Sequence, residues 1–569
     1  MHRPLPIRRR VAARPSALLA LVVLLAAPRP AGAVVRICSP DPLANTANVL
    51  CAPPSGPCDD SLVVVSTNLT VREGHCEFDL GGRALRMERT FRVPGHEFGG
   101  TLDGRIALRN AGDVTITRRA KLKARGDFVE PAGDVIGGGT IIVQSAGAIQ
   151  IDGLLDVTGD TGGDIAFLAR GDIELGARGK VRGHGISSFR DEGARFADGG
   201  DLFLRSLAGS VRVLGAIALP GANQAEGGEV DLEAGHDVVL ARGMDLSGGG
   251  GGGGEFFAGA GDDVHILGSI DASSRSGGEF GGDIFILAGI GDDPASGFVG
   301  VKAGGDLEIH GVTLDVRGSA NTNTFTGDGG SVDVSAAGAV HVGADVVVHA
   351  DSAPNLPDAG GGYVAVTSGE DLGDVPAADT DLEFAALVSA RGTEVGGALS
   401  LFSAGDILLS GPADLSGGFG GVLDVEAARN ATISAPIRLD ATRAEGFGGD
   451  VRLVAGRAAF GTLTIAADIL ASAGTAGDCI DFEATSCALR VAPRVTLAAS
   501  CNVFFDILRL TGRDTIDLGA GARFFAGPNG RVATIHPPGV VPTVGAGTLF
   551  TSALVDREDA NAEYPACGS

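Results

Sequence analysis

Regularly spaced aspartates are the residues of this chain best placed to do chemistry. Stacked carboxylates about 5 Å apart repel one another unless water or cations screen them. Calcium takes several oxygen ligands at about 2.3–2.6 Å, which carboxylates and glycine carbonyls could supply. One set follows an apolar residue late in each repeated unit: Asp156, Asp245, Asp271, Asp315, Asp414 and Asp440. A second set precedes the middle of a unit: Asp113, Asp172, Asp237, Asp263, Asp306 and Asp406.

Two interpretations of these aspartates compete. Five of them form our candidate cation ladder: Asp245, Asp271, Asp315, Asp414 and Asp440. However, the string AGAGDDVHI at 258–266 lacks the complete glycine-aspartate nonapeptide of calcium-binding toxin repeats. We therefore favour aspartates that cap local backbone N–H groups at turns. No cofactor is predicted, and calcium stays the alternative.

A histidine between glycines is the sharpest enzymatic motif. The string GHGISS, Gly183 to Ser188, resembles the GHG-[ILV]-S string of polygalacturonases. That resemblance implies that His184 supports carboxylates around a scissile sugar linkage, as glycoside hydrolysis requires. No paired-aspartate string precedes it, and a corner histidine explains the motif equally well. We predict no catalytic residue.

Other chemical motifs give no site. The seven glycines from Gly248 to Gly254 have no following Lys-Ser/Thr and no helix, so they are not a phosphate loop. Four histidines are expected to point outward from strands without clustering as metal ligands: His265, His310, His341 and His349.

The first 33 residues have the pattern of an export signal. Arginines precede an apolar run, Ala17 to Ala27, which is too short to span a bilayer at about 20 residues. Small residues at Ala31-Gly32-Ala33 favour cleavage there. The rest of the chain then has 38 basic and 70 acidic side chains, a formal charge of −32. We expect secretion or cell-surface display, with the periplasm open, no later transmembrane segment and no nucleic-acid partner.

The eight cysteines gather at the two ends of the chain. An exported protein with an even number of cysteines at each end favours disulfides over zinc. The candidates are Cys38, Cys51, Cys58 and Cys76 at the front, and Cys479, Cys487, Cys501 and Cys567 at the back.

Glycine pairs divide the middle of the chain into repeated units. They recur from Gly138-Gly139 to Gly448-Gly449 at intervals of 24 to 48 residues. Within a unit such as GGDIAFLARGDIELGARGKVRG, apolar residues alternate with polar ones, the period of a half-buried strand. Three such strands per unit, with glycines at sharp corners or positive φ, predict an all-β parallel β-helix. We expect it to be right-handed and three-faced, with roughly a dozen coils.

The domain prediction follows from these patterns. It comprises a signal peptide at 1–33, a cysteine-rich cap and first coils at 34–100, solenoid repeats at 101–477, and cysteine-rich last coils and cap at 478–569. Disulfides would staple both caps, because the end coils of a solenoid have bare strand edges.

The unit GGxVxLxAGxDVxLxxxxDLSGG resembles the coil consensus of filamentous-haemagglutinin-like bacterial surface β-solenoids. That resemblance implies a non-catalytic structural or adhesive protein that binds a glycan, a cation or a surface protein through its faces and inserted loops. The alternative is a polysaccharide lyase or glycoside hydrolase of the parallel β-helix type, which needs clustered aspartates with arginine or lysine. The sequence leaves the oligomeric state open.

Overall fold

The computed structural model describes most of the chain, with gaps. The described residues are 36–38, 61–66, 68–70, 76–94, 96–97, 104–126, 136–185, 197–222, 225–275, 280–289, 305–319, 327–354, 356–369, 380–477, 481–499, 506–560, 562, 564 and 567. The signal peptide predicted at 1–33 lies outside them. Every secondary-structure element in the described ranges is a β-strand. In this part of the chain, no helix has the length and apolar character needed to cross a bilayer.

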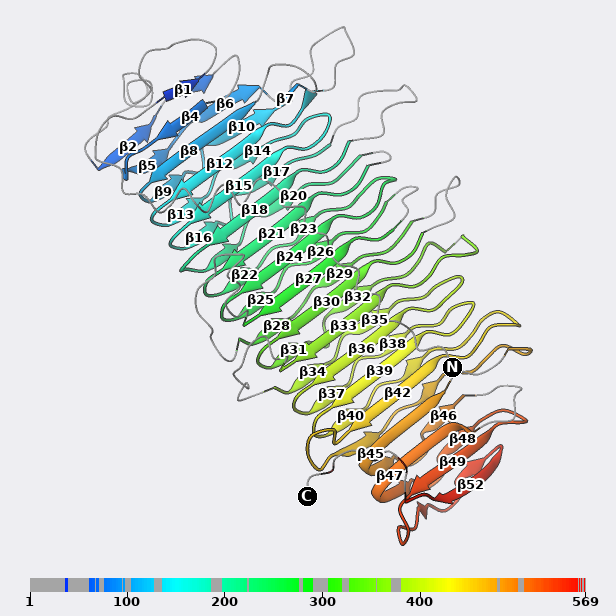
Figure 1. The fold of residues 1–569 in the computed structure, drawn as a ribbon. Coiled ribbons are helices and arrows are strands. Elements are labelled where there is room, and N and C mark those ends of the chain that lie inside the picture. Colours follow the sequence, from blue (N-terminus) through cyan, green and yellow to red (C-terminus); the bar gives the residue numbers. More distant parts are fainter. Residues whose placement is uncertain are drawn as a thin grey trace.

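The chain winds into an elongated stack of coils, and the predicted parallel β-helix is confirmed (Figure 1). A typical coil contributes one strand to each of three parallel stacks. The alternating pattern of the sequence explains this arrangement, because each strand turns its apolar residues inward and its polar residues outward.

The first stack contains the longest strand of most coils. In β15, for example, the buried residues Ile165 and Phe167 alternate with outward-facing neighbours. Its members are β4 (Cys76–Asp79), β8 (Arg105–Ala111), β12 (Thr140–Ser145), β15 (Asp164–Ala169), β18 (Asp201–Ser206), β21 (Glu229–Ala234), β24 (Glu255–Ala260), β27 (Asp283–Ala288), β30 (Ser331–Ala336), β33 (Tyr363–Ser368), β36 (Ala398–Ser403), β39 (Val422–Ala427), β42 (Asp450–Ala455), β45 (Phe482–Val491), β47 (Asp506–Leu518), β49 (Arg531–His536) and β52 (Ala553–Glu558).

In each coil, the strand of the second stack follows the strand of the first stack after a corner. Most of these strands have three residues, and the central residue faces outward. β45 is long enough to pair with both β42 and β43, which joins the first two stacks. The members are β2 (Leu62–Val65), β5 (Ala84–Met87), β9 (Val114–Ile116), β13 (Ile149–Ile151), β16 (Ile173–Leu175), β19 (Val211–Val213), β22 (Val238–Leu240), β25 (Val264–Ile266), β28 (Leu307–Ile309), β31 (Val340–Val342), β34 (Leu382–Phe384), β37 (Ile407–Leu409), β40 (Ala431–Ile433), β43 (Thr462–Ile465) and β50 (Thr543–Val544).

The third stack is made of short strands, and it positions the candidate site. Its members are β3 (Leu69–Thr70), β6 (Thr90–Pro94), β10 (Lys121–Arg125), β14 (Leu154–Asp156), β17 (Lys180–Arg182), β20 (Ala216–Ala218), β23 (Met244–Asp245), β26 (Ile270–Asp271), β29 (Thr313–Asp315), β32 (Val347–His349), β35 (Leu387–Ser389), β38 (Ala413–Asp414), β41 (Ile437–Arg438), β44 (Ile469–Leu470), β46 (Thr496–Ala498), β48 (Arg523–Phe525) and β51 (Leu549–Phe550).

One apolar core runs through the stack of coils. Inward residues of successive coils lie directly above one another, as Leu202, Val230 and Phe256 do in the first stack. The buried cluster continues without interruption from Val63 to Val532. Complete burial of such side chains contributes about 1.5–3 kcal/mol each before the entropy of ordering is subtracted, so the column itself holds the coils together.

The glycine pairs are required by close contact between coils, whereas we expected glycines where the backbone turns sharply or has positive φ. Both members of the pair Gly227-Gly228 lie outside the positive-φ region. A β-carbon on Gly227 would lie 1.8 Å from the carbonyl oxygen of Leu246, and one on Gly228 would lie 2.3 Å from that of Gly200. The backbone of a neighbouring coil, the following one for Gly227 and the preceding one for Gly228, therefore occupies the place of a side chain.

The two ends of the chain contain disulfides. Cys487 is bonded to Cys567, with 5.6 Å between their Cα atoms, so the polar tail returns to the body of the solenoid as predicted. Cys76 is also disulfide-bonded, and the antiparallel pair β1 (Arg36–Cys38) and β4 sets Cys38 opposite Cys76 in the backbone register. A second antiparallel pair joins β7 (His96–Glu97) to β11 (Ile136–Gly137). Four predicted disulfide candidates lie outside the described residues: Cys51, Cys58, Cys479 and Cys501.

Candidate functional site

The third stack aligns three of the predicted aspartates in one column. Asp245 ends β23, Asp271 ends β26 and Asp315 ends β29, and the strand register places each beside the next. The column continues through His349, Ser389 and Asp414.

The sixth member of the predicted set does not belong to this column. Arg438 is the residue that pairs with Asp414, and Asp440 lies two positions further along the chain. The sequence is misleading here because Ile437 and Leu439 are both inward-facing, and either could be the apolar residue that precedes the acidic position. The set of six predicted aspartates is thus interrupted, and Asp156 is also separated from Asp245 by Arg182 and Ala218.

Each carboxylate of the column caps the turn that follows it. The backbone N–H of Ser273 donates to Asp271 Oδ1 at 3.2 Å, and its hydroxyl donates to the same oxygen at 2.6 Å. Ser247 makes the same two bonds to Asp245. Burial alone would raise the pKa of Asp271, but the hydrogen bonds from Ser273 and Arg275 outweigh it and lower that pKa. The capping role favoured from the sequence is therefore confirmed at these positions.

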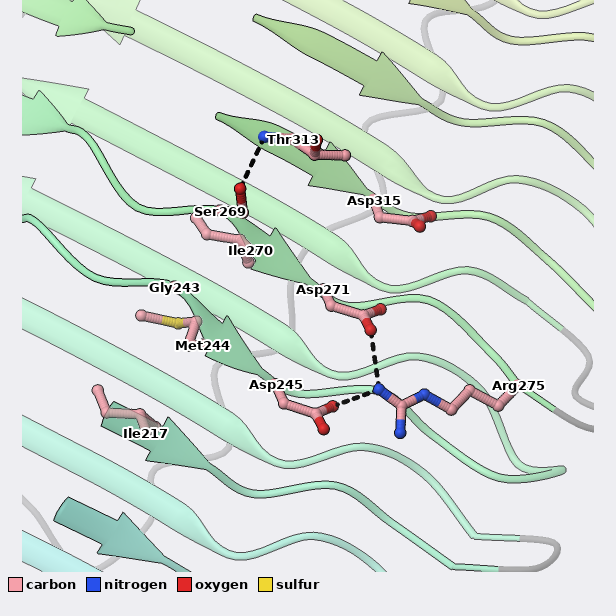
Figure 2. Close-up of a pocket in the computed structure, with 10 residues that line it drawn as sticks. All are labelled: Ile217, Gly243, Met244, Asp245, Ser269, Ile270, Asp271, Arg275, Thr313 and Asp315. Atoms are coloured by element: carbon pink, nitrogen blue, oxygen red, sulfur yellow. Dashed lines mark hydrogen bonds and ion pairs between the residues drawn. The ribbon is translucent and has the colours of Figure 1, made fainter. Parts of the chain in front are cut away.

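Arginines neutralise the stacked carboxylates. Arg275 Nη2 lies 3.0 Å from Asp245 Oδ1 and 2.9 Å from Asp271 Oδ2, so one guanidinium spans two coils (Figure 2). Arg317 contacts both oxygens of Asp315. Among the described residues, no three histidines, cysteines or carboxylates converge to hold a metal ion. These contacts supply the positive charge that calcium would supply in a cation ladder.

A shallow hollow of about 390 Å³ lies over this column. Beneath it lie the three neighbouring strands β20, β23 and β26; the side chains of Ile217, Met244 and Ile270 are buried in the core, so the floor is formed by the strand backbone. Its polar rim comprises Asp245, Asp271, Asp315, Ser269, Thr313 and Arg275, which Figure 2 shows on successive coils. The backbone N–H of Thr313 donates to Ser269 Oγ at 2.9 Å.

Sequence reasoning found the aspartates of the hollow but missed its other members. Ser269 and Thr313 precede apolar strand residues, and Arg275 follows an Asp-Ala-Ser turn, so local spacing gives none of them a shared location. His349, which we expected only to point outward from its strand, lies next to Asp315 in the column. A repeated Asp-x-Ser motif with a nearby arginine is the signal that could have indicated Arg275.

The second set of aspartates joins neighbouring coils. Asp263 Oδ1 accepts from the backbone N–H of Asp306, and Asp306 Oδ1 accepts from that of Ala339, each at 2.9 Å. Asp113, Asp172, Asp237 and Asp406 make equivalent bonds to the following coil. We expected caps of local N–H groups, but the bonded N–H belongs to the next coil, because stacking brings it closer than the residues along the chain.

His184 lies on the same side of the solenoid as the column, two residues after Arg182. Burial of its ring and the positive charge of Arg182 lower its pKa. The neighbouring Asp156 is held by Lys123 and Arg125 at 3.9 and 3.7 Å and accepts from the N–H of Thr158. Within the described residues, no carboxylate forms a hydrogen bond with the His184 imidazole.

A second acidic column, which the sequence reasoning did not identify, lies on the first face. It begins each first-stack strand on five successive coils: Asp164, Asp201, Glu229, Glu255 and Asp283. Reduced hydration and the charges of Asp164 and Glu229 raise the pKa of Asp201 to about 7. Beside this column, burial and the charges of Glu233 and Glu229 raise the pKa of Asp231 to about 8. The repulsion expected of stacked carboxylates is therefore present here.

Comparisons with known proteins identify no relative. No family model, curated protein or solved structure matches the chain. Its function must be argued from the geometry of its surface.

Proposed function

We propose that this chain is an exported, non-catalytic β-solenoid that serves as a structural or adhesive protein and binds glycans on its third face. The hollow over the column of Asp245, Asp271 and Asp315 is the observation that carries this proposal. The resemblance of the repeat to filamentous-haemagglutinin-like surface solenoids supports it, as does the export signal expected at 1–33.

The lining of the hollow matches the chemistry of a sugar ring. A sugar has an apolar face of C–H groups and an equator of hydroxyls, and binding sites combine an apolar surface with a few directed polar groups. Here the apolar face would lie on the floor formed by β23 and β26, while carboxylate oxygens and the hydroxyls of Ser269 and Thr313 would bond to sugar hydroxyls. The hollow is open, so it suits one or two units of a long chain rather than an enclosed small molecule.

The charge of the rim selects among glycans. Three carboxylates surround the hollow, and the guanidinium of Arg275 is already bound to two of them. A uronic acid would bring further negative charge to this surface and would be repelled. We therefore expect neutral or amino sugars to bind and uronans to bind poorly.

The experiment compares two aspartates with the same local structure. Asp271 and Asp414 both cap an Asp-x-Ser turn in the third stack, but only Asp271 lines the hollow. Neutral, amino and uronic oligosaccharides would be screened on an array, and the best ligand measured by calorimetry. Asp271→Asn should weaken binding at least tenfold, whereas Asp414→Asn should leave it unchanged. Equal affinity of both variants, or no ligand on the array, would refute glycan binding at this hollow.

A carbohydrate-active enzyme is the second candidate, because the structure brings aspartates and an arginine together as such an enzyme requires. The lowered pKa of Asp271 argues against it, since a general acid needs a raised one. Incubation with pectin, alginate and neutral polysaccharides near pH 7 separates the candidates. Turnover that disappears in His184→Ala would establish the enzyme and overturn the non-catalytic proposal.

A further inference from the structure

The second face of the solenoid has histidines and glutamates on consecutive coils. The outward residue is His265 in β25, Glu308 in β28, His341 in β31 and Glu383 in β34, and the register places each beside the next. His265 Nδ1 lies 3.1 Å from Glu308 Oε2, and His341 Nδ1 lies 2.9 Å from Glu383 Oε2. Each imidazole is therefore oriented by a carboxylate at Nδ1, and among the described residues its Nε2 makes no hydrogen bond.

A third histidine lies against His341. His310 follows β28 at the corner of the coil, and its ring centroid is 4.8 Å from that of His341 with 39° between the planes. Its Nδ1 is 3.9 Å from Asp345 Oδ1. The sequence separates the two histidines by 31 residues, so we expected no cluster; the stacking of coils brings them into contact.

Gly343 makes room for this contact. A β-carbon at that position would lie 2.5 Å from His310 Nδ1 and 2.7 Å from Asp345 Oδ1. Gly343 lies outside the positive-φ region, so its backbone conformation does not require glycine. Its missing side chain leaves the space in which the His310 ring lies against the following coil.

We propose that His310 and His341 together bind one divalent transition-metal ion of the copper, nickel or zinc class, with one imidazole nitrogen each. Imidazole suits these metals and coordinates them at about 2.0–2.1 Å, which two rings in contact can reach by small side-chain rotations. A carboxylate on the remaining ring nitrogen, as Glu383 provides for His341, is the usual support of a metal-binding histidine.

The site has two nitrogen ligands, and water completes the coordination. Asp345 is the nearest oxygen donor, since it lies beside His310 and its pKa is lowered by a backbone hydrogen bond from Gly311 and by both histidines. Copper should bind most tightly, following the general order of divalent affinities.

Copper titration of the whole exported chain, purified without a histidine tag, tests the site. Excess Ca²⁺ in the buffer occupies the surface carboxylates, so that the heat measured by calorimetry comes from copper binding to imidazole. We expect one Cu²⁺ per chain, with electron paramagnetic resonance showing two nitrogen ligands. His310→Gln and His341→Gln should each weaken binding at least tenfold and leave one nitrogen ligand. Gly343→Ala should also weaken binding, because it displaces the His310 ring without removing a ligand.

His265→Gln is the matched control. His265 contacts Glu308 as His341 contacts Glu383, but within the described residues no second imidazole ring lies against it. It should therefore bind copper as the unaltered chain does. If His310→Gln also binds copper normally, or if His265→Gln weakens binding as much, the copper is held by the general surface and the proposed site does not exist.

Discussion

Two adjacent glycines allow the close contact between coils to be measured. Ala359 is followed by Gly360, Gly361 and Gly362, none of which has positive φ. A β-carbon on Gly361 would lie 2.1 Å from the carbonyl oxygen of Ala390 and 2.6 Å from the nitrogen of Gly397. A β-carbon on Gly360 would meet nothing closer than Asp328 Oδ1 at 3.6 Å, an ordinary contact. Alanine should thus be rejected at one position and accepted at its neighbour.

The magnitude follows from what must move. An alanine at Gly361 can fit only if the coils separate locally, and such overpacking costs about 1–3 kcal/mol. The separation strains the bond from Gly397 N–H to Ala390 O, now 2.7 Å, whose loss adds about 1 kcal/mol. Gly361→Ala should therefore lower the free energy of unfolding by about 2–4 kcal/mol. Gly360→Ala should leave it unchanged or raise it by about 0.4–1 kcal/mol through the unfolded chain.

Urea denaturation followed by circular dichroism measures this difference. Both variants add one methyl group and restrict the unfolded chain equally, so their difference reports the contact between coils. Hydrogen exchange should show faster opening of the coils next to Gly361, because solenoid stability is a sum of neighbour interactions. Equal urea midpoints for Gly360→Ala and Gly361→Ala would show that the coils are not as closely stacked as described.

Three further predictions concern bonds between coils, charge and the tail. Asp263→Ala removes the acceptor for the N–H of Asp306 and should cost about 1 kcal/mol in urea denaturation, whereas Asp263→Asn should restore most of it. Asp231, with a pKa of about 8, keeps its proton in the folded chain after the unfolded chain has lost it, so stability should fall as pH rises from about 4 to 8. Asp231→Asn should flatten this decline and be more stable than the unaltered chain at pH 8.5 but not at pH 4; a parallel decline in both would contradict the assignment. Cys487→Ser should release the tail near Cys567, seen as earlier proteolysis there and a loss of about 2–4 kcal/mol; unchanged cleavage would show that the tail is held by other contacts.

Local patterns predicted the coil well because they report local structure. Alternation in units such as Asp164–Ala169 is a property of one strand, and the structure places Ile165 and Phe167 inside as expected. The tail disulfide was anticipated only as one of several pairings within a group of cysteines, since spacing does not fix connectivity. The glycine pairs were recognised correctly as corners, but their role was assigned to backbone conformation. Their actual role depends on the neighbouring coils, which no single unit encodes.

The candidate site was predictable only in part, for the same reason. Asp245 and Asp271 were placed in one column because each follows an apolar residue late in its unit. Asp440 was misplaced by two residues, and the contact between His310 and His341 was not foreseen.

The sequence by itself determined that this chain forms coils of three alternating strands with glycine corners, because strand period and turn chemistry act over a few residues. Only the tertiary structure decided which side chains share a column, which carboxylates an arginine spans and which histidines touch. These neighbours lie one coil apart, at chain separations that the inserted segments vary. Their register is set by the packing of inward residues against the preceding coil.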